Sequence, residues 1–313
     1  MALNFERVAV VATGVIGASW AALFLARGLE VDATDPSPGA EQRLRNAVQA
    51  HWPALVQQGL APGASTERLR FHAQLEAAVE HADFVQESGP EKLEAKVNLF
   101  ARMDAAAPAR AVLASSTSGL PITAIQRACR NPQRVVLGHP FNPPHLIPLV
   151  EVGGGQQTPP EAVADAMAFY TALGKRPIHV RREIKGHIAN RLQAALWREA
   201  FHLVREGVAS VADVDAAMAH GPGPRWALMG PFMNLHLSGG EGGIEHLLAH
   251  LGGPIEDWWR DLGNPSMDAA LQRQVIEGVA HALGDRTTQD ITQARDALLT
   301  GLLQAKRQSS ALD

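Results

Sequence analysis

The chain has 313 residues, of which 46% are hydrophobic and 19% charged, and its net charge is −4 at pH 7. This composition predicts a soluble globular protein, and the length favours two domains. The basic residues are scattered, which argues against a nucleic-acid partner. A single cysteine, Cys129, excludes an internal disulfide framework and a cysteine-rich metal site. The N-terminus is a poor signal peptide and the longest apolar stretch, residues 15–26, is too short to span a bilayer, so we expect a cytoplasmic protein with no membrane partner.

Short apolar runs alternate with helix-periodic segments through the first 180 residues. The strand-like runs are residues 8–11, 31–34, 69–71, 84–86, 112–114, 135–137, 149–152 and 178–180. Helical patterns between the early runs cover residues 16–27, 40–58 and 93–106. This alternation predicts βαβ units and a mainly parallel, doubly wound sheet.

After Glu183 the strand-like runs stop and helical patterns dominate. These patterns cover residues 188–206, 211–218, 243–251 and 267–283. The string Gly221-Pro222-Gly223-Pro224 predicts a turn or loop between helices. The fold class is therefore α/β, with a doubly wound domain over residues 1–184 followed by an all-helical domain over residues 185–313.

The first strand leads into a turn and a helix start at Ala12-Thr13-Gly14-Val15-Ile16-Gly17. This string matches the G-x-G-x-x-G fingerprint at its second and third glycines, where Gly14 would admit a pyrophosphate and Gly17 would let the helix pack close to the sheet. The second strand ends at Asp35, and an acid there accepts hydrogen bonds from the adenosine ribose and repels a 2′-phosphate. The sequence thus predicts a Rossmann-type NAD site that includes Ala12, Gly14, Val15, Ile16, Gly17 and Asp35.

Ala12 departs from the fingerprint because it stands at the position of the first glycine. If the turn needs a positive φ, alanine costs about 1 kcal/mol or more there. If φ is negative, the cost is crowding against the cofactor. An ordinary turn, whose glycines serve packing alone, is the alternative, and the strand before the turn and the acid after it argue against that alternative.

Polar residues follow the later strands, where doubly wound sheets bind their ligands. His139 ends an apolar strand and enters a proline-rich loop, and histidine titrates near the pH at which an alcohol proton must be removed. Glu151, on the next strand, could hold the imidazole in one tautomer, and Ser118 and Asn190 could hydrogen-bond the reacting oxygen. Each residue alone also has a structural interpretation, so the hypothesis depends on their combination.

The order and separation of Ser118, His139, Glu151 and Asn190, with the residues around each, resemble the 3-hydroxyacyl-CoA dehydrogenase family. The resemblance runs from about residue 5 to about residue 276. The resemblance implies an active site of Ser118, His139, Glu151 and Asn190, in which His139 removes the hydroxyl proton while a hydride passes directly from C3 of the substrate to NAD. It also implies that Glu91 and Lys96 line the nicotinamide-ribose side of the cofactor site. A helical C-terminal domain that forms a homodimer is a further implication.

Two features argue against an acyl-CoA substrate within this family: Ser115-Ser116-Thr117-Ser118 replaces the usual S-N-T-S, and no basic cluster suits the phosphates of CoA. The strings at residues 221–232 and 236–243 resemble family members that act on L-carnitine and, more distantly, on L-gulonate. We therefore expect a small-molecule substrate, a 3-hydroxy acid, with L-carnitine first and L-gulonate or a 3-hydroxyacyl-CoA as alternatives.

A quaternary ammonium such as that of carnitine is bound by aromatic faces. Trp226 and Phe232 are candidates for that contact, Phe141 lies beside His139 in the sequence, and Arg225 could pair with a carboxylate. The alternative is that the tryptophans of the helical half, with Trp258 and Trp259, fill its core and the dimer interface.

His246 and His250 are four residues apart on a helical stretch, a spacing that can bind a metal. No third ligand is evident and the chemistry needs no metal, so none is expected. A non-catalytic, crystallin-like binding protein is the competing class of function. The four intact active-site residues argue against it.

Overall fold

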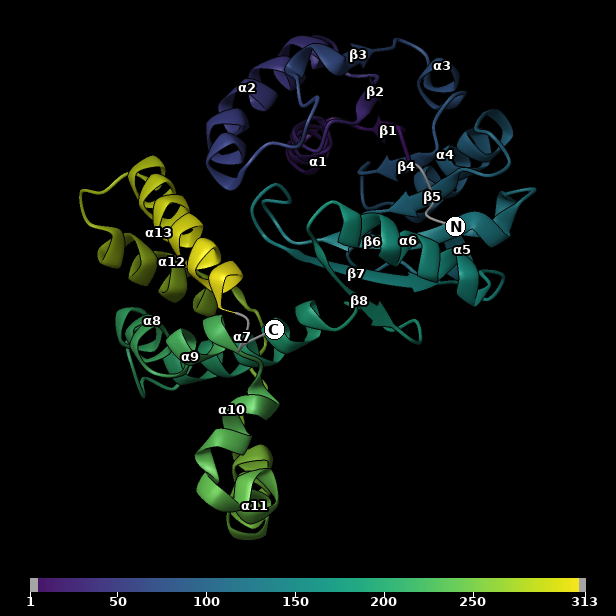
Figure 1. The fold of residues 1–313 in the computed structure, drawn as a ribbon. Helices are drawn as coiled ribbons and strands as arrows, with labels where there is room; N and C mark the ends of the chain where they lie inside the picture. Colours follow the sequence, from purple (N-terminus) through teal and green to yellow (C-terminus); the bar gives the residue numbers. More distant parts are fainter. Residues whose placement is uncertain (1–4, 310–313) are drawn as a thin grey trace. The chain divides into compact units, whose positions relative to one another are not determined.

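The structure is a computed structural model that describes residues 5–309, and its backbone contacts divide the chain into two compact units, Met1–Arg191 and Leu192–Asp313 (Figure 1). The division falls inside helix α7 (Ala189–Arg205), and a domain boundary between residues 184 and 185 stays a prediction. Within residues 5–309 no helix has both the length and the apolar character that a membrane span requires.

The first unit is built on one eight-stranded sheet in the order β3-β2-β1-β4-β5-β6-β7-β8. Its strands are β1 (Arg7–Val11), β2 (Glu30–Thr34), β3 (Leu69–Phe71), β4 (Phe84–Glu87), β5 (Val112–Ser115), β6 (Val135–Pro140), β7 (Leu149–Gly154) and β8 (Arg176–Val180). Neighbouring strands are parallel except β6 and β7, which are antiparallel. The predicted α/β class with a mainly parallel sheet is confirmed. The strand order reverses between β1 and β4, and such a switch point opens a crevice at the carboxyl ends of the strands.

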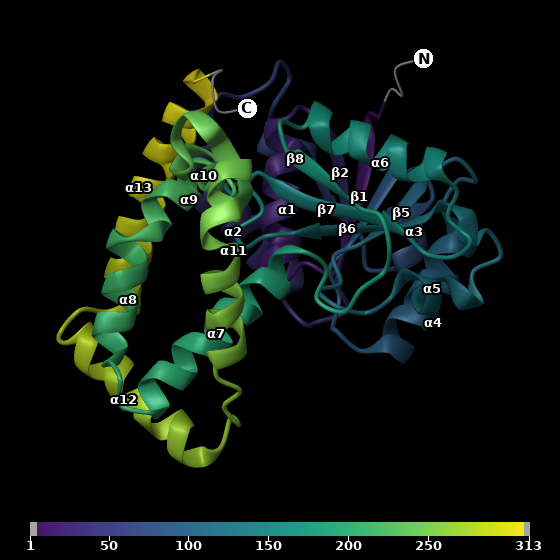
Figure 2. The same ribbon diagram turned by 90° about the horizontal axis from the view of Figure 1, so that it is seen from below.

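Helices cover both faces of this sheet, so its central strands read as continuous apolar runs; Val8, Ala9 and Val10 are fully buried. The helices are α1 (Val15–Ala26), α2 (Ala40–Gln58), α3 (Leu75–Val79), α4 (Leu93–Ala106), α5 (Ile122–Ile125) and α6 (Pro160–Ala172). Buried residues of α1, α2 and α6 form one core cluster and those of α3, α4 and α5 the other. Figure 2 shows α6 on one side of the sheet and α4 and α5 on the other.

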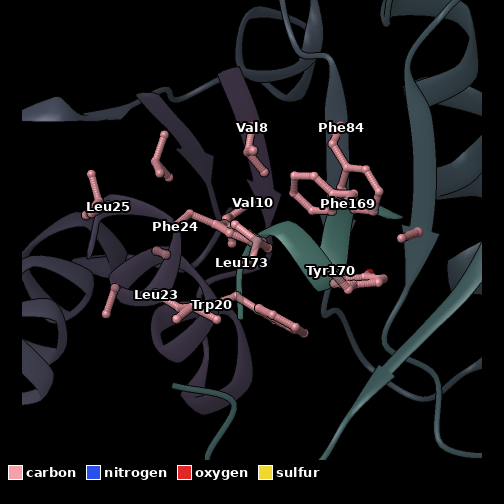
Figure 3. Close-up of a cluster of buried hydrophobic side chains, with 14 of the residues drawn as sticks. Val8, Val10, Trp20, Leu23, Phe24, Leu25, Phe84, Phe169, Tyr170 and Leu173 are labelled. Carbon is pink, nitrogen blue, oxygen red and sulfur yellow. The ribbon is translucent and has the colours of Figure 1, made fainter. Parts of the chain in front are cut away.

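Aromatic side chains fill the cluster under α1 and α6 (Figure 3). The rings of Phe84 and Phe169 stack with centroids 3.9 Å apart, and those of Trp20 and Phe24 stack at 5.3 Å. Phe24 of α1 also packs against Phe169 of α6, with centroids 5.9 Å apart, so α6 connects α1 to β4 and a rigid core holds the N-terminus of α1 at the switch point.

The second unit is helical, as predicted. Besides most of α7 it contains α8 (Val211–His220), α9 (Pro222–Leu228), α10 (Pro231–Ser238), α11 (Gly243–Asp261), α12 (Ala269–Leu283) and α13 (Thr288–Gln308). The turn or loop predicted between helices at residues 221–224 is shorter than expected: Gly221 alone separates α8 from α9, because α9 starts at Pro222. Proline suits the first position of a helix, where its missing N–H has no intrahelical partner to lose. Helix α13 was missed, although Thr287 and Asp290 form a capping box at its start.

Large apolar side chains of the second unit are mostly exposed. Within residues 192–309 the buried hydrophobic side chains are Val204, Leu247 and Leu271. Trp258 and Trp259 are 63% and 66% exposed, so the interpretation that they fill the core of the helical half is wrong. The interpretation that they belong to a dimer interface stays open.

Candidate active site

The central feature of the site is a histidine–glutamate pair on two antiparallel strands. His139 on β6 lies directly opposite Glu151 on β7, and its Nδ1 is 2.8 Å from Oε2 of Glu151. His139 is 6% exposed and Glu151 is fully buried. An ionised carboxylate only accepts, so Nδ1 carries the proton of the neutral ring and the lone pair lies on Nε2. The pair thus presents a base at Nε2.

The second oxygen of Glu151 accepts hydrogen bonds at the start of α7. The backbone amides of Ile188 and Ala189 donate to Oε1 at 2.8 and 2.9 Å. Burial alone would raise the pKa of Glu151, but the bonds from His139 and from these two amides outweigh it and hold the pKa below its ordinary value. Glu151 is therefore an anion that stabilises a positive charge on His139.

The predicted Ser118 and Asn190 join this network. The side-chain amide of Asn190 donates to the Ser118 carbonyl across a long 3.5 Å, and Asn190 directly follows Ala189. Oε1 of Glu91 accepts from the amide of Ser118 at 2.8 Å and from that of Gly119 at 3.1 Å, so Glu91 supports the serine loop.

The aromatic ring of Phe141 packs beside His139, with ring centroids 5.4 Å apart. The structure therefore places the four predicted catalytic residues and Phe141 in one region around His139. Their catalytic roles stay predictions.

Lys96 lies in a buried ion pair that the sequence analysis did not assign. Its Nζ donates to both oxygens of Glu87 at 2.7 and 2.9 Å and to the carbonyl of Gly89 at 3.1 Å. Lys96 is 2% exposed and Glu87 fully buried. The position of Glu87 at the end of β4, in the polar string that follows the strand, was the signal that could have found it. A contact of Lys96 with the cofactor stays a prediction.

The fingerprint turn resolves the question about Ala12, whose φ is +69°. Alanine therefore occupies a left-handed conformation that glycine adopts without strain. At Gly17 an added Cβ would lie 2.0 Å from the Ala12 carbonyl oxygen, which explains the glycine by close packing of α1 on the turn. At Gly14 an added Cβ would meet open space, so that glycine is not required by the protein's own packing.

The start of α1 and the end of β2 fit a dinucleotide. Gly14 makes no side-chain cap at the N-terminus of α1, which leaves the first amides of the helix for an anion, and Val15 is 72% exposed. Asp35 accepts from the amides of Thr13 and Ser37, both at 2.8 Å. Burial raises the pKa of Asp35, yet these amides outweigh it and lower the pKa overall. Asp35 is therefore held as an ionised acceptor, which is what a ribose hydroxyl requires.

Models of one family match both parts of the chain. The NAD-binding domain of 3-hydroxyacyl-CoA dehydrogenase matches residues 7–184, and the C-terminal domain of the same enzyme matches residues 186–264. The chain belongs to the 3-hydroxyacyl-CoA dehydrogenase family. It is an NAD-dependent dehydrogenase, as the fingerprint turn and Asp35 predicted.

Relatives within the family are similar over nearly the whole chain. L-carnitine dehydrogenase of Streptomyces griseus is 53% identical over 302 residues, which are 96% of this chain and 90% of that protein. The enzyme of the same name from Pseudomonas putida is 47% identical and covers 98% of this chain and 96% of its own.

Solved structures of dehydrogenases show the same fold. 5-Formyl-3-hydroxy-2-methylpyridine 4-carboxylic acid 5-dehydrogenase, described as an NAD⁺-dependent dismutase, superposes with a TM-score of 0.85 at 29% identity, covering 97% of this chain and 99% of its own. 3-Hydroxybutyryl-CoA dehydrogenase of Escherichia coli K12 gives a TM-score of 0.68 at 31% identity, covering 88% of this chain and 57% of its own.

The other predicted substrate-pocket residues of this family member lie in the second unit. Arg225 and Trp226 are on α9, and Phe232 is on α10. Trp226 is 47% exposed and Phe232 is 75% exposed, so neither side chain is buried within the described residues of the helical unit. Their contact with a substrate stays a prediction.

His187 is the residue near His139 that the sequence analysis did not select. Its backbone has a positive φ of +50°, its Nε2 is 3.0 Å from the carbonyl oxygen of Thr117, and its ring centroid is 5.3 Å from that of His139. The string Gly186-His187 was visible in the sequence, but no pattern showed where the ring would lie. Among residues 5–309, no three or more histidine, cysteine, aspartate or glutamate side chains are grouped as a metal ion would require.

Proposed function

We propose that the chain oxidises the 3-hydroxy group of L-carnitine to 3-dehydrocarnitine, with NAD as the acceptor. The observation that supports the chemistry is the buried pair of His139 and Glu151, which presents a base at Nε2. The observation that supports the substrate is the identity of 53% and 47% to two L-carnitine dehydrogenases over nearly the whole chain.

His139 acts as the general base of the reaction. Its Nε2 takes the proton of the substrate hydroxyl, and the anionic Glu151 stabilises the imidazolium that forms. The hydroxyl of Ser118 and the side-chain amide of Asn190 orient the oxygen as it becomes a carbonyl. NAD, when bound, accepts the hydride that leaves C3 of the substrate.

The first unit holds the cofactor at the switch point of its sheet. The amides at the start of α1, with Gly14, Val15, Ile16 and Gly17, receive the pyrophosphate, and the turn at Ala12 sets their direction. Asp35 accepts from the adenosine ribose. Glu91 and Lys96 support the nicotinamide-ribose side.

The second unit supplies the groups that recognise the charged ends of the substrate. The exposed faces of Trp226 and Phe232 suit a quaternary ammonium. In the first unit, Phe141 beside His139 is a further proposed substrate contact. Arg225 pairs with the substrate carboxylate. These roles require residues 185–313 to act as a substrate and dimerisation domain.

A homodimer in the cytoplasm is part of the same proposal. Support for the dimer comes from the large apolar side chains that the second unit leaves exposed, which include Leu298 at 77%. A surface of this kind marks an interaction site.

The experiment that tests the proposed function is a substrate panel with NAD, in which NADH formation is followed by absorbance. The panel contains L-carnitine, D-carnitine, L-gulonate, 3-hydroxybutyrate and 3-hydroxybutyryl-CoA. We expect kcat/KM for L-carnitine to exceed that for every other compound by about tenfold or more, because differential transition-state binding sets specificity. A higher kcat/KM for any other compound would overturn the substrate, and silence on all five together with no NADH binding would favour the non-catalytic class.

A further inference from the structure

We propose that His187 is a positioning residue of the dehydrogenase reaction, which fixes Ser118 by holding the peptide group that precedes it. The inference rests on the proposed function in that Ser118 orients the substrate oxygen. It concerns a residue that belongs neither to the predicted active-site residues nor to the cofactor site.

The peptide group between Thr117 and Ser118 is held at both of its polar ends. Nε2–H of His187 donates to the carbonyl oxygen of Thr117 at 3.0 Å, and the amide N–H of Ser118 donates to Glu91 at 2.8 Å. Thr117 is fully buried and His187 is 5% exposed, so water does not compete freely for the carbonyl. A peptide plane bonded on both sides resists rotation, and this holds the backbone from which the Ser118 side chain extends.

The backbone around His187 is shaped to deliver this bond. Gly186 and His187 have positive φ angles of +78° and +50°, and the amides of the next two residues donate to Glu151. Left-handed backbone at a residue other than glycine is strained and persists where surrounding contacts over-determine it. The turn at Gly186 and His187 therefore contacts the Ser118 loop through His187 and the His139 pair through Glu151. It also leads directly into the first turn of α7, which carries Asn190.

The imidazole of His187 is suited to donate as a neutral ring. Burial lowers its pKa, and the neighbouring His139 lowers it further, against the bond to Thr117 and the charges of Glu151 and Glu91, which raise it. The neutral ring has one N–H, and the Thr117 carbonyl fixes it at Nε2. A neutral ring 5.3 Å from His139 also places no like charge beside the imidazolium that forms during turnover.

Two substitutions separate the hydrogen bond from the shape of the ring. His187→Phe keeps an aromatic ring but removes the donor, whereas His187→Gln removes the ring and keeps a terminal N–H₂ that can reach the Thr117 carbonyl. Both place an ordinary side chain on the same left-handed backbone, so the strain is matched between them. If His187→Phe does not fold, His187→Leu takes its place as the variant without a donor.

We expect His187→Phe to lower kcat by about 10- to 100-fold, because a small misplacement of an orienting group costs that much, while the NADH dissociation constant changes less than about twofold. His187→Gln retains kcat within about threefold of the wild type. Equal loss in both variants, or a kcat for His187→Phe within about twofold of the wild type, would overturn the proposal.

Failure of the proposed substrate gives a different result. The kinetic comparison uses whichever compound of the panel the wild type oxidises fastest, so inactivity on L-carnitine alone rejects that substrate and leaves the comparison intact. A second readout needs no substrate: backbone hydrogen exchange in residues 117–120 should be faster in His187→Phe than in the wild type, and unchanged in His187→Gln. Equal exchange in the two variants overturns the proposal whatever the substrate is.

Discussion

The two units differ in what they bury. The first unit buries polar and charged side chains in matched pairs: His139 with Glu151, Lys96 with Glu87, and Arg134 with Asp104 at 2.8 Å. The second unit leaves apolar side chains exposed, including Trp258 at 63%, Phe232 at 75% and Leu298 at 77%.

The difference indicates how the work is divided. Buried charges are tolerated only when they are paired and hydrogen-bonded, so the first unit is complete as a rigid frame for proton and hydride chemistry. The exposed apolar side chains of the second unit are the surface through which the proposed homodimer would form. We therefore expect substitutions at the polar pairs of the first unit to change chemistry. Substitutions of exposed apolar residues of the second unit, apart from the proposed substrate contacts Trp226 and Phe232, should change association.

The largest effect should come from the polar pair of the first unit. His139→Ala should lower kcat by about 10³-fold or more, because it removes the general base, while NADH binding stays intact. The readout is NADH formation, with NADH affinity measured by fluorescence. His179→Ala, which alters an exposed histidine on β8 of the same unit, is the control and should leave both quantities unchanged. Activity of His139→Ala within tenfold of the wild type would show that another group is the base.

Apolar residues of similar exposure in the two units allow a direct test of which unit mediates self-association. On α12, Ile276 and Val279 are 65% and 49% exposed, and on α2 of the first unit Val56 is 52% exposed. We expect Ile276→Glu with Val279→Glu to weaken self-association by about tenfold or more, because buried unpaired charge is costly at an interface. Val56→Glu should leave it unchanged. Sedimentation velocity measures both, and a monomeric wild type would contradict the homodimer.

Lys175 is a buried cation of the first unit that donates to carbonyl oxygens, those of Pro144 at 2.6 Å and of Ile147. Burial, with the nearby Arg27, lowers its pKa to about 7 from 10.5. Between pH 7 and pH 10.5 Lys175 is protonated in the unfolded chain and largely neutral in the folded one. The free energy of unfolding therefore rises with pH in this range, and the destabilisation by Lys175 is greatest below pH 7. Relative to Lys175→Met, the wild type should gain up to about 1.4 kcal/mol of unfolding free energy per pH unit above pH 7. Urea unfolding at about pH 7 and pH 9 measures this, and a difference independent of pH would place the pKa elsewhere.

The smallest effect concerns the fingerprint turn. Ala12→Gly should raise the free energy of unfolding by about 0.5–1 kcal/mol and tighten NADH binding, because glycine adopts φ +69° without strain. Gly14→Ala is the opposite control: its Cβ meets open space in the protein, so stability should hold while NADH binding weakens. Unchanged affinity in Ala12→Gly would mean that the turn tolerates alanine even when the cofactor binds.

The sequence predicted secondary structure well where apolar residues recur with the period of a strand or a helix. Alternating apolar runs predicted all eight strands, and the helices α2 and α4 begin and end at the predicted residues. The alternation of strand-like and helical segments predicted the fold class, and the short strings around the site residues predicted the family. The turn predicted at residues 221–224 was too long, because glycine and proline also occupy helix starts and the pattern does not separate the two uses.

The site was predictable only in part, because its remaining contacts join residues distant in sequence. The pairing of His139 with Glu151 depends on an antiparallel register, and the contact of His187 with Thr117 spans 70 residues. Ala12 has a positive φ, and a Cβ at Gly17 would clash with the Ala12 carbonyl oxygen; no single-sequence pattern reports either fact. Glu87 stands at the polar end of β4, but no pattern paired it with Lys96, which was assigned to the cofactor instead.

The antiparallel pairing of β6 and β7 has a consequence for variation in length. Successive side chains of a strand point to opposite faces, so a deletion of one residue within either strand would turn His139 and Glu151 away from each other. The connecting residues 141–148 lie outside both strands, and a change in their number leaves the register intact. Engineered insertions in this enzyme should accordingly be placed in the connection rather than in the ladder, and within the connection away from Phe141.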